Sequence, residues 1–355
     1  MTITRSEPRR CSPSLPYARG PLSHAVATAL REGSAPAAPS EDGEPYGEDL
    51  QLALYVLYEL HYQGFDGVDD DREWDPALLA LRRALEERFQ AALRADVPVA
   101  GVGSRQALDE LQAEPVGDDG TGVSHFLRNQ GRLEHLREYA ALRSLYHLKE
   151  ADPHAWVIPR LHGRAKAAMA AVEFDEFGAG RADEIHAGLY ADLMQDLGLS
   201  TAYGYYLDAA PAELLATVNL MSLFGLHRGL RGALTGHFAA VEVTSSPGSR
   251  RLAEALRRVG AGAAATRFYE EHVVADAVHE QVVRHDVVGG LLESEPGLEA
   301  DVVFGVRATD FLEDRLAAYL LKAWRGGGSA LRTGPLPPVR EARRADDGEP
   351  GRGTI

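Results

Sequence analysis

Two histidines and an aspartate recur at helical spacing within residues 267–288. The segment RFYEEHVVADAVHEQVVRHDVV places His272, Asp276 and His279 at positions i, i+4 and i+7. With 3.6 residues per helical turn, the three side chains project from one stripe within an arc of about 60°. Valines and alanines surround them, so the stripe is predicted to follow the apolar side of a helix, where unpaired polar groups are costly to bury. A metal ion would satisfy these groups, as would polar contacts with neighbouring helices.

Carboxylates upstream supply the rest of a possible metal site. Acidic residues interrupt otherwise apolar segments at Glu150, Glu176 and Glu242, and His186 follows Glu176 by ten residues. Such carboxylates are expensive to bury unless they are paired or bound to a metal. Carboxylates and imidazoles without sulfur suit iron or manganese, and helix-bundle cores build di-iron sites from them. The Glu-x-x-His pairs of ferritin-like sites are absent from the sequence, which disfavours an ordinary ferritin-like site.

Other polar residues are weaker candidates. Glu173 lies one helical turn before a candidate ligand, so it is either an additional carboxylate ligand or a supporting or surface residue. His147 and His154 flank Glu150, and isolated histidines of this kind are expected to be structural. Glu59 and His61 are two residues apart and therefore face different sides of a helix, which makes them poor metal partners.

Composition restricts the class of protein. The 355 residues are 45% hydrophobic and 25% charged, which is ample for a buried core. A formal net charge of −16 argues against nucleic acid as a partner, because phosphate binding needs a basic face. The single Cys11 excludes disulfides and thiolate metal sites. No apolar stretch has the length of a signal peptide core or a membrane span, so we expect a cytoplasmic protein without membrane association.

Apolar periodicity predicts an all-α protein. Strand-like alternation is confined to residues 240–245. The predicted helices occupy residues 48–63, 76–94, 131–149, 158–178, 183–198, 211–224, 226–242, 249–258, 262–292 and 300–324. The domain organisation that we expect is a mostly disordered arm over 1–44 with a short helix at 23–31, a helical extension over 45–130, a main helical domain over 131–325, and a flexible tail over 326–355.

Several motifs together resemble the heme-oxygenase-like di-iron oxidases, also described as iron-containing redox enzymes. The motifs are LKEADPHAWVIPRL, EFDEFGAGR with a histidine ten residues after its last glutamate, VEVTSS and EHVVADAVHEQV. They occur in the expected order, and the resemblance covers about 140–325. It implies that residues 131–325 form a seven-helix fold shared with heme oxygenase, preceded by an N-terminal helical extension, and that this fold holds two irons instead of haem.

The same resemblance implies a division of the ligands between the two irons. Glu176 bridges or binds both irons. The other ligands of the first iron are Glu150, His186 and His279. Those of the second iron are Glu242, His272 and Asp276. The ten-residue spacing after Glu176 and the third histidine resemble the N-oxygenating members of the family.

The reaction implied is O2 activation through a peroxo-diferric intermediate, followed by N-oxygenation of a small amine, amino acid or guanidino compound in specialised metabolism. Alternatives are oxidative C–C cleavage, decarboxylation or desaturation of an amino or fatty acid, and a non-catalytic metal- or haem-binding helical protein. No flavin or nicotinamide fingerprint is present, so a reductase, a ferredoxin or a small reductant must supply electrons. The helices at 48–94 offer a surface for a possible homodimer.

Overall fold

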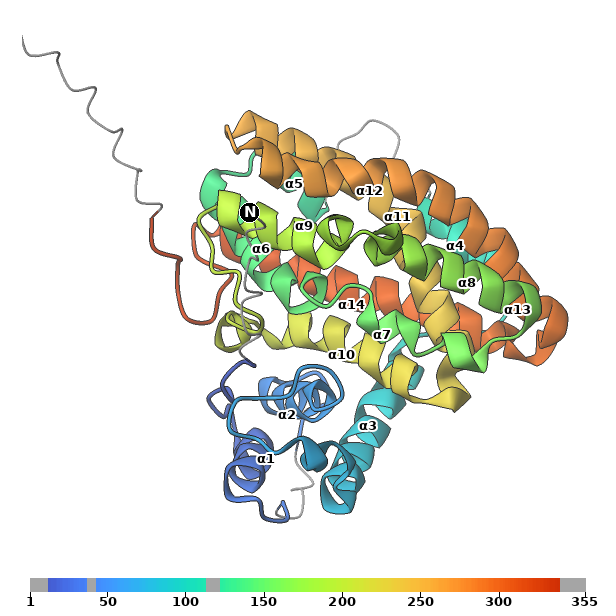
Figure 1. Cartoon of the computed structure of the whole chain (residues 1–355), viewed down its shortest axis with the longest axis horizontal. Helices are drawn as coiled ribbons and strands as arrows, with labels where there is room; N and C mark the ends of the chain where they lie inside the picture. Colours follow the sequence, from blue (N-terminus) through green and yellow to red (C-terminus); the bar gives the residue numbers. More distant parts are fainter. Residues whose placement is uncertain (1–11, 37–42, 113–121, 339–355) are drawn as a thin grey trace, which may run out of the picture.

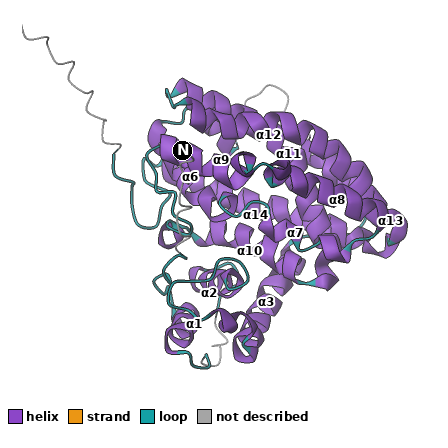
Figure 2. Cartoon of the chain, viewed as in Figure 1, coloured by secondary structure: helices purple, strands orange, loops and turns teal. Residues whose placement is uncertain are grey.

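The computed structural model describes residues 12–36, 43–112 and 122–338, and it consists of helices joined by loops (Figure 1). No strand occurs within these ranges (Figure 2). Residues 240–245, whose alternation resembled a strand, lie inside a long helix. The prediction of an all-α protein is therefore confirmed. Within the same ranges, no helix is both long enough and apolar enough to cross a bilayer.

The body of the molecule is a bundle organised around two long helices. α11 (Arg231–Arg258) packs along α14 (Glu299–Arg325) and also along α12 (Ala263–Val282), and α12 in turn packs on α9 (His186–Asp196). A π-helical turn, Val283–Val288, continues α12 and packs on α8. The other α-helices of the body are α4 (Ser104–Gln112), α5 (Val123–Asn129), α6 (Leu133–His147), α7 (Asp152–Ala155), α8 (Gly163–Glu176), α10 (Ala212–Leu226) and α13 (Gly289–Ser294).

Glycines allow α11 and α14 to approach each other closely. A Cβ atom built on Gly236 would overlap the backbone carbonyl oxygen of Val302, and one built on Gly305 would overlap that of Ala233. Helical carbonyl groups cannot move aside without disturbing their own helix, so the crossing tolerates no side chain at either position. The two glycines therefore fix the distance between the longest helices of the body.

Three N-terminal helices form a layer beside α10, seen in blue and cyan in Figure 1. They are α1 (Pro21–Glu32), α2 (Glu48–Glu59) and α3 (Pro76–Asp96). α2 is buried on all sides from Leu50 to Glu59 and packs against α1, α3 and α10. Asp49 accepts hydrogen bonds from the backbone N–H groups of Leu22 and Ser23 and so caps α1. The apolar residues of α2 are thus covered by the same chain, and a homodimer through this layer stays a prediction.

Residues 12–36 are folded and include α1 of this layer, although the sequence predicted a mostly disordered arm over 1–44. The short helix expected at 23–31 is present as α1, in which Val26 and Leu30 are buried. The numerous prolines suggested disorder. Local composition does not show that Val26 and Leu30, one helical turn apart, are buried when α1 packs against α2. The rest of the predicted arm lies outside the described residues.

Residues 326–338 also pack onto the body, although a flexible tail was predicted over 326–355. Ala330 and Leu331 are buried. The Oε2 atom of Glu138 in α6 accepts a hydrogen bond from the backbone N–H of Ala330 at 2.8 Å. This long-range contact orders a glycine-rich segment whose composition indicated flexibility. The remainder of the predicted tail lies outside the described residues.

α11 continues without a break through Pro247, where the sequence predicted two helices over 226–242 and 249–258. Proline lacks a backbone N–H and removes one hydrogen bond from a helix interior. Val243 and Leu252, on either side of the proline, are both buried in the bundle. Tertiary packing of both halves therefore outweighs the local cost of the proline.

Replacing Gly236 with alanine is expected to lower the free energy of unfolding by about 1–3 kcal/mol, because the added methyl group overpacks the α11–α14 crossing. Urea unfolding measures this change. Gly248→Ala in the same helix is the matched control, since a Cβ atom there meets no atom within 4 Å. Its better helix propensity should raise stability by up to about 1 kcal/mol. Equal losses in the two variants would contradict the close crossing.

Candidate metal centre

Six of the seven candidate ligands are buried together inside the bundle. The first group consists of Glu150, Glu176, His186 and His272. The second group consists of Glu176, Glu242 and His279. Within each group, one ligand atom of every residue lies within 4.8 Å of those of the others. The seventh candidate, Asp276, lies in α12 between the two histidines, but its side chain is outside those that the structure describes.

Most of these residues are placed by helices and helix ends. Glu176 is the last residue of α8 and His186 the first residue of α9. The loop between them turns back at Gly178, which has a φ of 79° and leaves no room for a Cβ atom beside the backbone nitrogen of Ile185. The ligands from α11 and α12 lie within those helices. Glu150 alone projects from a turn, between α6 and α7.

The first group presents imidazole nitrogens to carboxylate oxygens. The Nδ1 atom of His186 lies 2.7 Å from Oε2 of Glu176. The Nδ1–H of His272 donates to the backbone carbonyl of Phe268 at 2.7 Å, which leaves the lone pair on Nε2. This Nε2 atom is buried, lies 3.9 Å from Oε2 of Glu150, and has no hydrogen-bond partner among the described residues. His272 is therefore oriented as a metal ligand requires.

The second group is organised around His279. Its Nδ1 atom lies 3.4 Å from Oε2 of Glu242 and 3.6 Å from Oε1 of Glu176, while its Nε2 atom contacts Oδ2 of Asp175 at 3.2 Å. Burial by itself lowers the pKa of His279, but the hydrogen bond and charge of Glu242 outweigh it, and the pKa rises to about 9. In the metal-free chain a proton therefore fills the space between these carboxylates.

The division of the histidines between the two groups differs from the one expected. The resemblance placed His279 with Glu150 and His272 with Glu242, and the structure exchanges them. Seven residues advance about 10.5 Å along a helix, so the two histidines lie at different depths of the same stripe. Their spacing cannot tell which end of α12 lies beside α9, where His186 is, and this direction decides the grouping.

The apolar surroundings of the histidine stripe were also predicted wrongly. The side chains of Val274 and Val278 are 71% and 63% exposed, so these valines face away from the core. The buried residues of α12 include the two histidines together with Ala265, Phe268 and Tyr269. The polar residues thus face the bundle because the carboxylates of α8 and α11 lie there, not because valines accompany them.

The donor set fits a pair of metal ions that share Glu176. Buried carboxylate oxygens and imidazole nitrogens converge on two neighbouring points, without sulfur, as iron or manganese prefers. Each histidine of α12 has its other ring nitrogen bonded to an oxygen atom, Phe268 O in one case and Asp175 Oδ2 in the other. Such partners orient the imidazoles of metal sites. The geometry is compatible with a di-iron centre.

His147 has a role in the site that sequence reasoning did not assign. Its Nδ1 atom bonds Oε2 of Glu150 at 3.0 Å. Burial raises the pKa of Glu150, but the charge and hydrogen bond of His147 outweigh it, followed by His272, and the pKa falls to about 2. His147 therefore holds this carboxylate ionised and oriented. The three-residue spacing between His147 and Glu150 could have indicated this contact. Because α6 ends at His147, helical spacing did not predict it reliably.

His154 lies outside both groups, in a buried chain of hydrogen bonds. Thr309 donates to the carbonyl of Gly305, so it accepts from Nδ1 of His237 at 2.7 Å. The other nitrogen of His237 then accepts from Nε2 of His154 at 3.1 Å. Nδ1 of His154 faces the hydroxyl of Tyr146 at 3.4 Å. Burial lowers the pKa of both histidines, that of His237 to about 4, so both are neutral.

Glu173 is a buried carboxyl group beside the site but belongs to neither group. It is 2% exposed, and neither oxygen has a hydrogen-bond partner among the described residues. Burial raises its pKa to about 9, and the negative charges of Glu176 and Glu242 add to the effect. Glu173 is therefore uncharged at neutral pH in the metal-free chain. Its sequence position, one turn before Glu176, hinted at this proximity.

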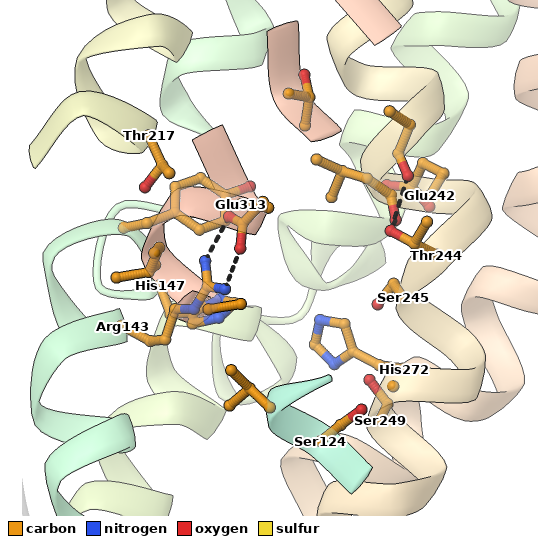
Figure 3. A pocket seen from close by; sticks show the side chains of 18 of the residues that line it. Ser124, Arg143, His147, Thr217, Glu242, Thr244, Ser245, Ser249, His272 and Glu313 are labelled. Carbon is orange, nitrogen blue, oxygen red and sulfur yellow. Dashed lines mark hydrogen bonds and ion pairs between the residues drawn. The ribbon is translucent and has the colours of Figure 1, made fainter. Parts of the chain in front are cut away.

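A cavity of about 420 Å³ reaches the candidate ligands, a size suited to a small organic molecule. Glu150, Glu242 and His272 line one part of it. The opposite wall carries Arg143, whose two terminal nitrogens bind Glu313 at 2.8 and 2.5 Å. Figure 3 shows this ion pair across the cavity from His272 and Glu242. The cavity therefore has an ion pair on one side and the carboxylate–imidazole groups on the other.

Comparison with models of protein families identifies a match over the centre of the chain. A family model described as iron-containing redox enzyme matches residues 137–314. The matched range includes all seven candidate ligands. No curated protein is detectably similar to the chain.

Glu173→Gln is expected to make the stability of the metal-free protein less dependent on pH. The folded-state pKa of about 9 exceeds the value of about 4.3 for an unperturbed glutamate, so the folded state holds an additional proton between these values. Stability therefore falls as pH rises through this window. Glutamine cannot titrate, so the contribution of Glu173 disappears in the variant, while the contributions of other groups, His279 among them, are retained.

Urea unfolding of chelator-treated protein at about pH 5, 7 and 9 measures this slope. Glu138→Gln is the matched control, because Glu138 is equally buried but hydrogen-bonded to Trp324 and Ala330. It should lower stability through the loss of these hydrogen bonds, which measures the effect of replacing a buried carboxyl group in the same way. Identical slopes in wild type and Glu173→Gln would show that Glu173 is ionised in the folded protein.

Proposed function

Because the chain belongs to the iron-containing redox enzymes and has their heme-oxygenase-like all-α fold, we propose that it is a non-haem di-iron oxygenase that oxidises the nitrogen of a small amine, amino acid or guanidino compound. The observation that carries this proposal is the pair of buried carboxylate–imidazole groups that share Glu176 beside a cavity. A haem site needs an axial ligand within an apolar slot. Several buried carboxylates therefore disfavour haem.

In this proposal the two groups are the two iron sites. The first iron takes Glu150, His186 and His272, the second takes Glu242 and His279, and Glu176 serves both. Asp276 is proposed as a further ligand from its place on the same helical stripe. When bound, two ferrous ions would supply the chemistry of O2 reduction, in which one oxygen atom passes to the substrate nitrogen and the other leaves as water, with two protons and two electrons from a reductase, a ferredoxin or a small reductant.

The protein's own residues position the ligands and enclose the substrate. His147 and Asp175 hold the ligand side chains that they contact, and the backbone carbonyl of Phe268 holds His272. With iron bound, His186, His272 and His279 would each take up a ligand position that could otherwise be open to substrate. We therefore propose that the substrate is held by the cavity, with its nitrogen facing the metal groups, and does not bind iron directly.

The reaction class is tested with iron-loaded protein and a substrate panel. The panel of amines, guanidines and carboxylic acids is mixed with reduced protein and O2, and products are identified by mass spectrometry. The proposal expects consumption of an amine or guanidine and formation of a hydroxylated nitrogen. If only carboxylic acids react, giving an alkene or a shortened acid, N-oxygenation is wrong and oxidative cleavage or desaturation takes its place. Iron binding without any O2-dependent spectral change would indicate a carrier.

Anaerobic reconstitution is expected to load about two irons per chain, as in other carboxylate-bridged helix-bundle sites. His272→Ala and Asp276→Ala should each lower the iron content sharply, because each removes a ligand of a buried site. His285→Ala is the matched control, since His285 is an exposed histidine shortly after the same helix. Iron content is measured by metal analysis after desalting. Normal iron in both variants would rule out His272 and Asp276 as ligands.

A further inference from the structure

A buried ion pair connects the N-terminal layer to the turn that carries Glu150. The Nζ atom of Lys149 lies 2.9 Å from Oε2 of Glu59, and the two side chains are only 2% and 0% exposed. Glu59 is the last residue of α2, and Lys149 directly precedes Glu150. The family match begins at residue 137, so Glu59 lies outside it. The pair therefore links a candidate iron ligand to a part of the chain that the family model does not cover.

Aromatic residues complete the surroundings of this pair. Tyr203 donates its hydroxyl hydrogen to Oε1 of Glu59 at 2.7 Å. The ammonium group of Lys149 lies 4.2 Å from the ring centre of Tyr62 and 5.1 Å from that of Tyr55. Desolvation makes a buried ion pair expensive unless such additional contacts satisfy both charges. Removing one partner would leave an uncompensated charge in the interior, so the two residues are expected to stay together.

The pair adds a long-range contact to a buried turn that short-range backbone hydrogen bonds also hold. The backbone N–H of Lys149 donates to the carbonyl of Tyr146 at 2.8 Å, and its carbonyl accepts from the N–H of Asp152 at 2.9 Å. Lys149 is thus held at its backbone and at the end of its side chain. Glu150 follows it in the chain and is the candidate ligand that lies outside the helices. His147 holds only the carboxylate end of Glu150.

We propose that Glu59 and Lys149 are positioning residues for the first metal group, so that iron binding by Glu150 depends on the N-terminal layer. The inference rests on the proposed di-iron function. The sequence indicated that Glu59 is a poor metal partner, which agrees with this role. In the proposal Glu59 binds no metal and instead holds Lys149, the residue next to the candidate ligand Glu150. The N-terminal layer is accordingly part of the working metal centre and not a separable accessory.

The inference is tested by comparing the full-length wild-type protein with Glu59→Gln. Each is titrated anaerobically with Fe(II), and calorimetry measures the affinity of each binding step. Loss of a partner that orients a metal ligand typically weakens metal binding by about 10–100-fold. The variant should therefore show this loss at one of two binding steps and an unchanged affinity at the other. Its metal-free form should also unfold at a lower temperature, because Lys149 keeps a buried unpaired charge.

A double variant, Glu59→Leu with Lys149→Met, separates positioning from charge burial. Apolar replacement of both partners removes the unpaired charge and should restore the unfolding temperature of the metal-free protein to near the wild-type value. The weakened iron binding should persist, because the turn remains without its anchor. The double variant also provides the binding measurement if Glu59→Gln does not fold.

Glu86→Gln is the matched control within the N-terminal layer. Glu86 is also buried and contacts the body, through His227 at 2.9 Å, but it contacts no candidate ligand. It should lower the unfolding temperature and leave both iron affinities unchanged. Wild-type affinities in the two Glu59 variants would overturn the inference alone. Failure of the wild-type protein to bind iron would overturn the proposed function and the inference together.

Discussion

The centre of this bundle depends on how the repulsion between closely spaced, buried carboxylates is compensated. These carboxylates belong to four residues from three separate parts of the chain: Glu150, Glu173, Glu176 and Glu242. Negative charges repel one another strongly in a poorly polarisable interior. The metal-free chain compensates this repulsion with protons, because the raised pKa values leave Glu173 uncharged and His279 positively charged. Divalent ions would supply the same compensation with a geometry that can also perform chemistry.

The surrounding helices keep these groups in place against their repulsion. The glycine crossing of α11 and α14 leaves almost no freedom in the separation of the two longest helices. On the other side, the pair of Glu59 and Lys149 anchors the turn before Glu150, while His147 orients its carboxylate. Helix packing and these contacts act together with the protons on Glu173 and His279 to keep the groups close. Through Glu59, the N-terminal layer contributes one of the contacts.

The cavity relates the metal groups to a substrate. The Arg143–Glu313 pair lies on one side of the cavity, and His272 and Glu242 lie on the other. A small polar molecule in the cavity would therefore lie between an ion pair and the candidate metal ligands.

The sequence by itself determined the all-α class and the residue types of the centre. The spacing of His272 and His279, together with isolated acidic residues in apolar segments, indicated candidate ligands, six of which lie together in the structure. It did not determine which group each histidine joins, because a helical period defines a face but not the direction of the helix beside its neighbours. Only the tertiary structure revealed the pair of Glu59 and Lys149, and the packing of segments with loop-like composition. Both depend on contacts between residues far apart in the chain, which local pattern and composition cannot encode.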